Sequence, residues 1–319
     1  MRLLMLGTGP FAAPTFRGLF ETHHEVIALV SSPLRPQHGR ELIPLSPMRD
    51  IAHQQGVPIF DPERINEPES QIQLSQYDAD LMVVCDYGQI LSAESLATAQ
   101  MGGINLHASL LPKYRGAAPI NWAIYDGQRQ TGVTVIHMTP RVDAGPCIAQ
   151  AATDIEAEET AVELEARLSE LGAWLVRRTL DALEAGRIEA LPQNPTLASK
   201  APRLKKTDGL IFWYRPALAI KDQIRAMEPW PKTYTFWHRR NGPPLRLIFG
   251  PVKVEEQPEK TASPGTVLRA GEQGLSIAAG SGAIAPQTIQ PAGKRVLSVE
   301  EFLRGYPVQP GDRFGDEAG

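Results

Sequence analysis

The sequence predicts a two-domain α/β protein, in which a Rossmann-like parallel sheet with helices is followed by a small OB-like β-barrel. Three observations lead to this prediction. The 319 residues are enough for two domains. Apolar strand-like runs alternate with helical patterns over the first two-thirds, which is typical of βαβ units around a parallel sheet covered on both faces. After Asp208, short β-type runs separated by glycine and proline replace that alternation.

The elements of the first domain follow from its hydrophobic periodicity, taken in chain order. Near-continuous apolar runs predict buried strands, at residues 2–6, 26–31, 81–85, 104–107 and 133–138. Apolar residues at helical spacing predict helices, at residues 13–21, 46–55, 93–100, 119–125 and 160–185. Ligands of open α/β sheets bind beyond the carboxyl ends of the strands, so we expect a site in the turns that follow these strands.

A proline-rich stretch separates the two parts of the chain. Residues 192–202 have the composition of a linker. We therefore predict an N-terminal domain at 1–194, a linker at 195–207 and a C-terminal domain at 208–319. The C-terminal domain is predicted to hold one helix and several short strands, although Pro286 interrupts the last of them. The helix is at 217–226 and the strands are at 234–237, 245–248, 265–268, 275–278 and 284–289.

The composition argues against several classes of protein. No apolar run approaches the ~18 residues of a membrane span, and the apolar start is too short for a secretory signal. The two cysteines, Cys85 and Cys147, and the seven scattered histidines show no metal-ligand spacing. We therefore expect a cytoplasmic protein without membrane association, without a disulfide framework and without a metal.

The net charge of −4 is unevenly distributed along the chain. From Arg203 onward there are 17 Lys and Arg against 12 Asp and Glu, whereas the part before it has 15 against 24. A basic part on an acidic protein suggests a polyanionic partner for that part. An excess of this size is also common in proteins that bind no nucleic acid.

The strand predicted at 104–107 carries the most informative polar residues. Residues i and i+2 of a strand face the same way, so Asn105 and His107 project together while Ile104 and Leu106 pack on the other side. An amide and an imidazole placed together suit an electrophilic carbonyl, because one stabilises a developing oxyanion and the other donates or shuttles a proton. Asp143 could orient the imidazole. Taken singly, each residue is more often a turn, cap or structural residue.

Two further motifs allow more than one interpretation. Residues 7–12 satisfy G-x-G-x-x-A after the first strand, which is a dinucleotide-binding pattern. The second strand ends without a carboxylate for a ribose, and Pro10 lacks an amide donor, so we expect a tight turn and no nicotinamide cofactor. The polar loop at 32–42 contains Arg35 and Arg40. It is either an ordinary exposed connection or a basic finger that orders on a phosphate-rich partner.

A set of motifs spread over almost the whole chain resembles those of the folate-dependent formyltransferases, which transfer a formyl group from 10-formyltetrahydrofolate. The central motifs are Asn105-x-His107-x-Ser109-Leu110-Leu111-Pro112, Tyr114-Arg115-Gly116-Ala117-Ala118-Pro119-Ile120, Thr131-Gly132-Val133-Thr134 and Asp143-x-Gly145. Within this superfamily, the chain resembles the members that act on methionyl-tRNA. The motifs that point to them are Gln290-Pro291-Ala292-Gly293-Lys294 and Gln309-Pro310-Gly311-Asp312.

The resemblance implies a role for each matched residue. Asn105 and His107 would polarise the formyl carbonyl, Asp143 would orient His107, and the neutral α-amine of methionyl-initiator tRNA would attack directly, without a covalent enzyme intermediate. The folate would lie along two strand ends, at Ser109, Leu110, Leu111, Pro112, Asp86, Tyr87, Gly88 and Gln89. The tRNA would contact basic residues, at Arg35, Arg40, Lys205 and Lys206. We expect the protein to be a monomer.

The chain departs from the family pattern at three places. Glu41 follows Arg40 where further basic residues are usual, Asp86 replaces a small or apolar residue, and the Asp143 motif continues with Ala-Gly-Pro. Alternative functions are a formyltransferase acting on a nucleotide-sugar amine, a non-catalytic RNA-binding protein, and a folate hydrolase that releases formate. The basic C-terminal part argues against the first alternative, and the intact Asn105, His107 and Asp143 argue against the second.

Overall fold

The structure of the chain is a computed structural model, and it describes residues 1–34, 46–256 and 262–317. Arg35 and Arg40, which the sequence suggests as tRNA contacts, lie outside the described residues. The chain forms two compact units. The first comprises Met1–Pro119, Gln130–Asp154 and Glu163–Pro202, and the second comprises Ile120–Arg129, Ile155–Val162 and Arg203–Gly319.

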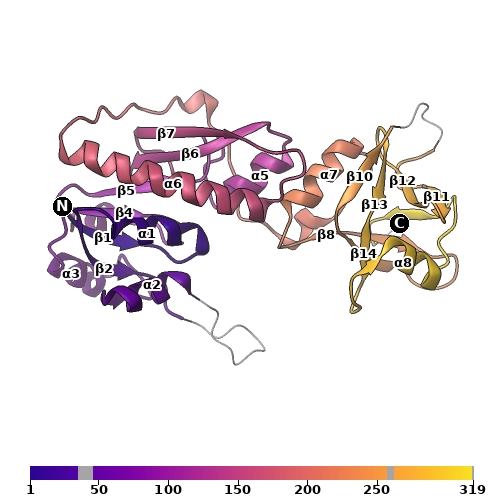
Figure 1. The fold of residues 1–319 in the computed structure, drawn as a ribbon, viewed down its shortest axis with the longest axis horizontal. Coiled ribbons are helices and arrows are strands. Elements are labelled where there is room, and N and C mark those ends of the chain that lie inside the picture. The colour runs from indigo at the N-terminus through magenta and orange to yellow at the C-terminus, as the bar shows by residue number, and fades with distance from the viewer. Residues whose placement is uncertain (35–45, 257–261, 318–319) are drawn as a thin grey trace. The chain divides into compact units, whose positions relative to one another are not determined.

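The first unit is built on a seven-stranded sheet with the order β3-β2-β1-β4-β5-β6-β7 (Figure 1). The strands are β1 (Arg2–Leu6), β2 (Glu25–Val30), β3 (Ile59–Phe60), β4 (Leu81–Val84), β5 (Gly103–His107), β6 (Gln130–His137) and β7 (Cys147–Asp154). The first five strands in the spatial order are parallel; a parallel arrangement was predicted for β2, β1, β4 and β5, whereas β3 was not predicted. Strand β4 and strand β1 from Leu3 onward are apolar and buried, because both faces of the sheet are covered.

Two strands on one side of the sheet, β6 and β7, correct the prediction of a wholly parallel sheet. The predicted strand at 133–138 is part of β6, which runs antiparallel to β5, and β7, which was not predicted, runs antiparallel to β6. The connection from His137 to Cys147 is too short for a parallel crossover, which needs a dozen or more residues, but long enough for an antiparallel return. The sheet is therefore mixed and mostly parallel.

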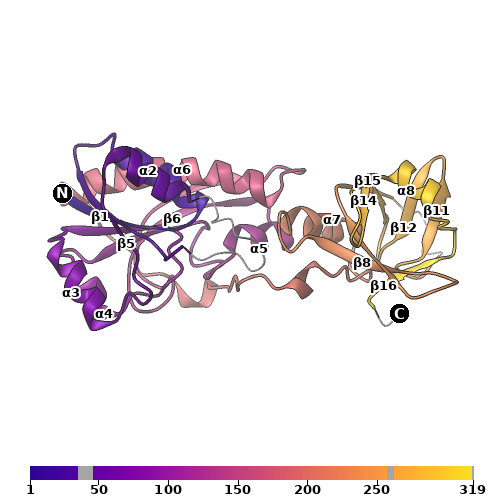
Figure 2. The ribbon, with the colours of Figure 1, turned by 90° about the horizontal axis from the view of Figure 1, so that it is seen from below.

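Helices lie on both faces of this sheet. Figure 2 shows α2 (Pro47–Gln55) and α6 (Ala161–Glu184) on one side, and α3 (Pro68–Gln76) and α4 (Ala93–Leu96) on the other. The short α1 (Ala13–Leu19) follows the 3₁₀ turn η1 (Pro10–Ala12). Proline stands at the first or second position of α1, α2 and α3, where its missing amide donor costs nothing because those amides have no partner within the helix.

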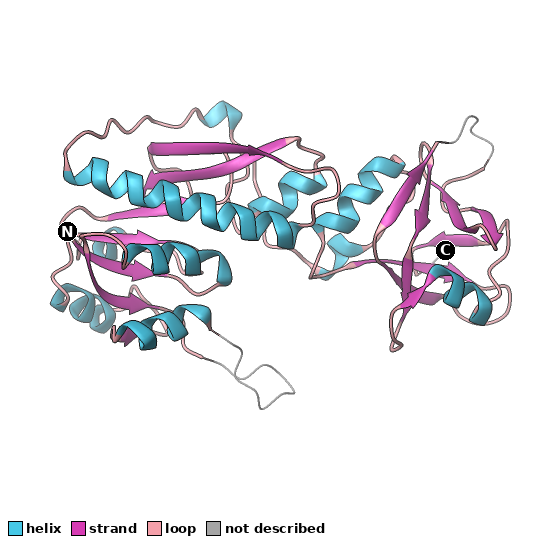
Figure 3. Ribbon diagram, viewed as in Figure 1, coloured by secondary structure: helices cyan, strands magenta, loops and turns pink. Residues whose placement is uncertain are grey.

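The second unit contains two antiparallel sheets and two helices of its own, α7 (Ala217–Ala226) and α8 (Val299–Gly305), besides most of α5 (Pro119–Tyr125), and Figure 3 distinguishes its strands from its helices. One sheet has the order β10-β13-β12-β11 and the other β15-β14-β9-β8-β16. The strands are β8 (Thr233–His238), β9 (Leu245–Phe249), β10 (Val252–Glu255), β11 (Val267–Gly271), β12 (Gly274–Ala278), β13 (Ala283–Pro286), β14 (Thr288–Pro291), β15 (Leu297–Ser298) and β16 (Arg313–Gly315). Their inner faces enclose one hydrophobic core, around Trp213, Leu247, Phe249, Phe302 and Phe314.

One strand prediction in this unit was wrong. The run at 284–289 is not a single strand, because β13 ends at Pro286 in one sheet and β14 starts at Thr288 in the other. Proline cannot donate to a ladder, which fits a change of sheet at this point. Elsewhere the predicted helices at 119–125 and 217–226 match α5 and α7. No helix among the described residues has both the length and the apolar character that a membrane span requires.

Candidate active site

The candidate site lies at the carboxyl ends of three neighbouring parallel strands, β1, β4 and β5. Leu6 of β1 pairs with Val84 of β4, and Val84 pairs in turn with Asn105 of β5, so these three ends are level with one another. The turn after β1 is tied to the turn after β4, since the Thr8 amide and hydroxyl both donate to the Asp86 carbonyl oxygen, at 3.0 and 2.6 Å. A Cβ on Gly9 would collide with the Asp86 carboxyl group, so this glycine permits the close packing of the two turns.

Strand β5 places Asn105 and His107 at the site. Ile104 and Leu106 are buried on the opposite face, as the period-two pattern predicts. Gly172 of α6 lies against Leu106 so closely that a Cβ at this position would press into the leucine side chain. The helix therefore fixes the strand from behind, and the polar pair is held on a rigid element.

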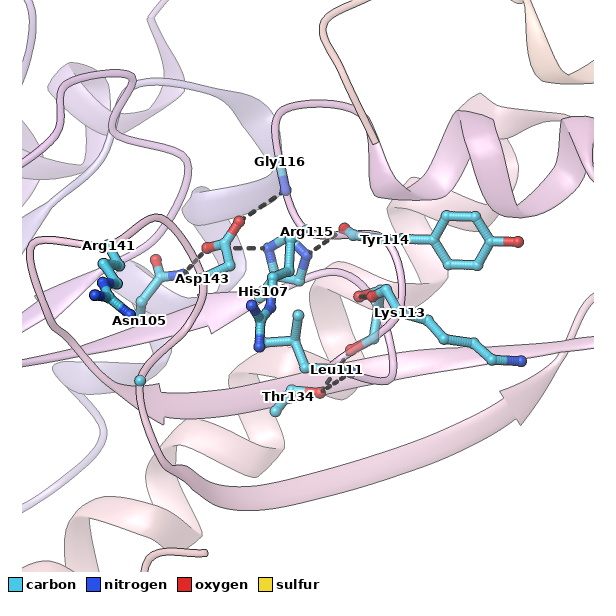
Figure 4. A network of polar contacts seen from close by, with 12 residues as sticks. Asn105, His107, Leu111, Lys113, Tyr114, Arg115, Gly116, Thr134, Arg141 and Asp143 are labelled. Carbon is cyan, nitrogen blue, oxygen red and sulfur yellow. Dashed lines mark hydrogen bonds and ion pairs between the residues drawn. The ribbon is translucent and has the colours of Figure 1, made fainter. Parts of the chain in front are cut away.

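Asp143 joins Asn105 and His107 although it lies far away in the sequence (Figure 4). Its Oδ1 accepts from Asn105 Nδ2 at 3.4 Å and lies 3.6 Å from His107 Nδ1. Its Oδ2 accepts from the Gly116 amide at 2.8 Å. The structure thus brings the three predicted catalytic residues together. Both contacts of Oδ1 are longer than an ordinary hydrogen bond. The Asn105 amide nitrogen and the His107 imidazole nitrogen therefore approach the same oxygen, and neither is held by a short hydrogen bond.

The protonation pattern of His107 follows from its second contact. Its Nε2 lies 2.9 Å from the carbonyl oxygen of Tyr114. A carbonyl oxygen only accepts, so Nε2 must carry a proton, and Nδ1 is the nitrogen that faces Asp143. Tyr114 has a φ of 62°, in the left-handed region that bulky residues rarely adopt. This strained residue aims its carbonyl group at the imidazole and so fixes the orientation of the ring.

The loop between Ser109 and Lys113 is closed by hydrogen bonds that do not depend on a ligand. The Ser109 hydroxyl donates to the Lys113 carbonyl oxygen at 2.6 Å, and the Thr134 hydroxyl donates to the Ser109 carbonyl oxygen at 2.6 Å. Gln150 donates to the Leu111 carbonyl oxygen at 2.7 Å. The side chain of Ser109 is fully buried, so this loop can meet a ligand through its outer atoms and its main chain rather than through the Ser109 hydroxyl.

A glutamine that the sequence did not single out connects the catalytic loops. Gln193 Nε2 donates to the carbonyl oxygens of Asp143 and Gly145, at 2.8 Å each, and its Oε1 accepts from Arg115 Nη2 at 2.6 Å. Ser199 accepts from the Tyr114 amide through its hydroxyl at 2.9 Å. Residues 193–201, most of which were expected to form a linker, therefore hold the loops of the site in place. The composition of this segment resembles a loop, and only long-range contacts identify its role.

Gly145 is required where the Asp143 loop passes the end of β6. A Cβ at this position would penetrate the His137 carbonyl group. We expect Gly145→Ala to displace the Asp143 loop and to lower kcat by about tenfold or more, because an ångström-scale misplacement of a catalytic group is costly. The measurements are kcat and the melting temperature. Gly305→Ala is the matched control, since no atom lies within 4 Å of its added Cβ; equal activity of both variants would contradict the assignment.

The turn after β4 holds Asp86, Tyr87, Gly88 and Gln89, four residues predicted to lie along the folate. Gln89 is already engaged, since its side chain accepts from the Ile65 amide at 2.9 Å and donates to the Pro62 carbonyl oxygen at 3.2 Å. Tyr87 is buried, and its hydroxyl is among the buried polar atoms that have no hydrogen-bond partner within the described residues. Tyr87 packs in the hydrophobic core behind the turn, so its side chain anchors the turn to the sheet.

Asp86 is the most perturbed acid of the site. Its residue surface is exposed, yet the surrounding protein reduces the hydration of the carboxyl group, and this desolvation raises the pKa of Asp86 to about 6. Glu165 of α6 is affected as well: burial raises its pKa, and the negative charge of Asp86 adds to the effect. Asp86 and Glu165 therefore repel each other when both are ionised.

Removing the charge of Asp86 should stabilise the protein in a pH-dependent way. A pKa raised from 3.8 to about 6 means that the folded state binds the proton more tightly, so the stabilising contribution is complete below pH 3.8 and is lost as pH rises through 6. We expect Asp86→Asn to raise the free energy of unfolding at pH 7.5 by at most ~1 kcal/mol, because solvent screens an exposed group.

The check is urea unfolding of the Asp86→Asn variant and the unchanged protein at pH 7.5 and at pH 4.5. The stabilisation should shrink at the lower pH. Asp154→Asn, which removes an exposed carboxylate elsewhere, is the control. A gain for Asp86→Asn that is the same at both pH values would show that charge repulsion is not its cause.

Comparison with known proteins identifies the family. A family profile described as "Formyl transferase" matches residues 1–180, and one described as "Formyl transferase, C-terminal domain" matches residues 203–307. Methionyl-tRNA formyltransferase of Rhodopirellula baltica is 41% identical over 325 aligned positions, which cover 98% of this chain and 96% of that protein. The enzyme of the same name from Geobacter sulfurreducens is also 41% identical, over 99% and 97% of the two chains. The chain belongs to the methionyl-tRNA formyltransferase family.

Solved structures support the same fold at lower identity. An N-formyltransferase from Helicobacter canadensis, solved with folinic acid and dTDP-3-aminofucose, matches with a TM-score of 0.67 and 17% identity, covering 89% of this chain and 98% of that one. HypX from Aquifex aeolicus, solved with tetrahydrofolic acid, matches with a TM-score of 0.62 and 17% identity, covering 98% and 50%. Both comparisons show that the architecture is shared.

The remaining predicted site residues lie in the second unit or beyond the described residues. Lys205 and Lys206 are exposed, at the start of the 3₁₀ turn η3 (Lys206–Gly209). The Lys205 amide donates to Asp208 Oδ2 at 2.7 Å, which fixes the backbone and leaves the ammonium group in solvent. Arg35 and Arg40 belong to the part of the chain that the structure does not describe.

Proposed function

We propose that this chain transfers the formyl group of 10-formyltetrahydrofolate to the α-amino group of methionyl-initiator tRNA. The observation that carries the proposal is the convergence of Asn105, His107 and Asp143 at the end of β5, in a chain with full-length relatives of that name at 41% identity. Folate-dependent formyl transfer is the chemistry of this family. The specific formyl donor, the initiator tRNA as acceptor and the roles of the residues are the parts that we propose.

Asn105 and His107 supply the polar atoms for an electrophilic carbonyl. The bound cosubstrate would supply the activated formyl group, with its oxygen among the nitrogens of these two side chains. Asn105 Nδ2 donates without a change in protonation, and His107 presents Nδ1 to the same region. Donors fixed in advance by a strand stabilise a developing negative charge with little reorganisation, which is the main source of rate enhancement in such sites.

Asp143 positions the side chains of Asn105 and His107. Its Oδ1 accepts from Asn105 Nδ2 and faces His107 Nδ1, while its bond to the Gly116 amide holds the carboxylate in place. The incoming amine must be neutral to attack, and it loses a proton as the new C–N bond forms. The released nitrogen of the folate gains a proton as its bond to the formyl carbon breaks. In this proposal His107 and water carry these protons, and the amine attacks the formyl carbon directly without a covalent enzyme intermediate.

The folate would lie along the turn after β4 and the loop after β5. The main chain of the two segments would meet the polar ring edge of the folate, and the half-buried side chain of Leu110 would contact its flat aromatic system, beside the buried Tyr87 and Leu111. The other residues of the two segments would shape the slot mainly through their backbone. They are Asp86, Gly88, Gln89, Ser109 and Pro112.

The acceptor tRNA would contact the basic residues Arg35, Arg40, Lys205 and Lys206. We also propose that the protein acts in the cytoplasm as a monomer, with a catalytic domain that extends beyond residue 194 through the supporting segment at 193–201 and a tRNA-binding domain from 208 onward. Contacts between lysine and phosphate are largely independent of sequence and release counterions. A role in tRNA binding therefore has a salt-dependent signature.

Removing Lys205 and Lys206 together should weaken tRNA binding and flatten its salt dependence. Each lost phosphate contact lowers the slope of log K against log salt by about 0.7–0.9, so we expect the slope to fall by up to about 1.8. The measurement is a titration of charged initiator tRNA at several salt concentrations, comparing the unchanged protein with the Lys205→Ala, Lys206→Ala double variant. Arg187→Ala, an exposed cation beyond the end of α6, is the control. An unchanged slope in the double variant would remove these lysines from the interface.

The decisive test of the function is a formylation assay. The protein is incubated with 10-formyltetrahydrofolate and methionyl-initiator tRNA, and formyl-methionine is measured after deacylation. We expect product, and we expect Asn105→Ala to abolish it. Formate release without formyl-methionine would indicate folate hydrolysis instead, and transfer to a nucleotide-sugar amine but not to tRNA would indicate the sugar-modifying class.

A further inference from the structure

Residues 210–215 of the second unit present two large aromatic side chains to solvent. The segment leads from η3 into α7 (Figure 1), and its side chains alternate between core and solvent. Ile211 and Trp213 are only 3% and 4% exposed. Phe212 and Tyr214 are 62% and 66% exposed, and their ring centroids lie 5.4 Å apart. Single apolar side chains on a surface are ordinary, but two adjacent aromatic rings this exposed indicate a binding surface.

The main chain beneath this aromatic pair is held by the neighbouring strand. The Ile211 amide donates to the Tyr234 carbonyl oxygen of β8 at 2.9 Å. The buried indole of Trp213 donates to the hydroxyl of Thr235, also on β8, at 3.0 Å. The two exposed rings are therefore carried by an ordered backbone, so a partner that contacts them does not have to order the segment first.

A second pair of aromatic rings lies on β8 itself. Leu210 forms a parallel bridge with Tyr234, so the segment runs beside this strand. Tyr234 and Phe236 are half-buried, alternate with buried threonines, and have their ring centroids 6.0 Å apart. The Arg246 guanidinium of β9 lies 4.0 Å from the centroid of the Tyr234 ring. The strand beside the segment thus adds further rings and a positive charge.

The charges close to the aromatic pair in the sequence favour a polyanion. Lys205 and Lys206 are exposed and precede the segment by a few residues. Two acids of the same stretch are engaged within the fold: Asp208 accepts from the Lys205 amide at 2.7 Å, and Asp222 pairs with Arg225 at 2.9 Å. The lysine ammonium groups remain in solvent, where they can contact phosphates.

We propose that Phe212 and Tyr214 form a stacking surface for unpaired nucleotides of an RNA. Every nucleobase has an aromatic face, so exposed rings stack on bases of any sequence while cations beside them contact the phosphates. A protein partner would match the rings but not the lysines, which are depleted in protein interfaces. The inference rests on the proposed function for the identity of the RNA as tRNA, and it adds base stacking, a contact that lysine and phosphate cannot provide.

The test is the binding of fluorescein-labelled RNA to the full chain, measured by anisotropy. The probes are a single strand of about eight nucleotides, which is within the usual site size, and a duplex of the same length. We expect the Phe212→Ser, Tyr214→Ser double variant to bind the single strand about tenfold or more weakly, and to bind the duplex almost as before. Equal affinity of the double variant and the unchanged protein for the single strand would overturn the proposal.

Two single variants control for the residue type and for the hydroxyl group. Trp174→Ser removes a 43% exposed aromatic side chain from the first unit and should bind the single strand like the unchanged protein. Tyr214→Phe keeps the ring and should also bind normally. A loss in Tyr214→Phe as large as in the double variant would assign the effect to the hydroxyl and contradict stacking. The melting temperature of the double variant should be unchanged, because both side chains are exposed.

Salt dependence separates stacking from phosphate contacts. The slope of log K against log salt reflects the number of phosphates contacted, so it should be the same in the aromatic double variant and in the unchanged protein. The variant that lacks Lys205 and Lys206 should behave in the opposite way, with a lower slope. A slope that falls in the aromatic double variant would show that these rings act through the backbone of the RNA, which would overturn the proposal.

The outcomes for the stacking surface and for the proposed function are distinguishable. If no formyl-methionine forms but single-strand binding depends on the rings, the proposed function fails and the stacking surface stands. If formylation proceeds and the double variant binds tRNA and the single strand normally, only the stacking surface fails. Self-association that is lost in the double variant, with RNA binding unaffected, would assign the rings to a contact with a second copy of the chain and overturn the proposal.

Discussion

Replacing His107 with asparagine is expected to lower kcat by about 10²–10⁴, the usual contribution of a positioned acid–base group. The folate dissociation constant should stay nearly unchanged, because His107 faces Asp143 and the Tyr114 carbonyl group rather than the proposed folate segments. Asparagine retains a donor but cannot carry a proton between the reacting atoms. The measurements are single-turnover formylation of methionyl-tRNA and equilibrium binding of a folate analogue.

The control for this experiment is His53→Asn, on the exposed side of α2. It changes the same residue type away from the sheet edge and should leave both quantities as they are. Equal losses of turnover and of folate affinity in His107→Asn would mean that His107 mainly shapes the folate site. A loss of melting temperature in His107→Asn would instead assign part of the effect to folding.

Replacing Asp143 should be as damaging, for a different reason. Asp143→Asn keeps an acceptor for the Gly116 amide but removes the charge that faces Asn105 and His107. We expect kcat to fall by about 10²–10⁴, as is typical when an electrostatic partner is lost from a preorganised site. Asp143→Ala removes the Gly116 contact as well, and should lower the melting temperature in addition.

The comparison of the two Asp143 variants tests its role directly. If the charge is what matters, both variants lose similar activity, and only the alanine variant is less stable. If Asp143 merely holds the loop through Gly116, the asparagine variant keeps most of its activity. Asp154→Asn is the control for a carboxylate removed from the same unit without a contact to the site.

The catalytic strand could be predicted from the sequence because its information is local. Alternation along β5 places Asn105 and His107 on one face, and the following proline and glycine end the strand. The bounds of α5 and α7 were predicted correctly for the same reason. The position of Asp143 was only suggested, since no spacing rule connects residues on β5 with a loop after β6.

Other parts of the fold could not be predicted because their signals are weak or distant. Strand β7 is exposed at alternate positions and contains alanine, threonine and glutamine, so it lacks a clear apolar pattern. Gln193 and Ser199 lie in a segment with the composition of a linker. Their contacts with Arg115 and Tyr114 span 78 and 85 residues, and such pairs become visible only when the chain is folded.

The contacts made by residues 193–201 determine where the two parts of this enzyme can be separated. A protein shortened at residue 194 would keep Asn105, His107 and Asp143 but would lose the partner of the Tyr114 amide, and with it a support of the strained loop. Exchanging C-terminal parts between relatives should therefore succeed when the junction follows Pro202 and fail when it precedes Ser199. The catalytic part of the chain therefore extends beyond the last strand of its sheet. Recombination between family members is limited to junctions that follow this segment.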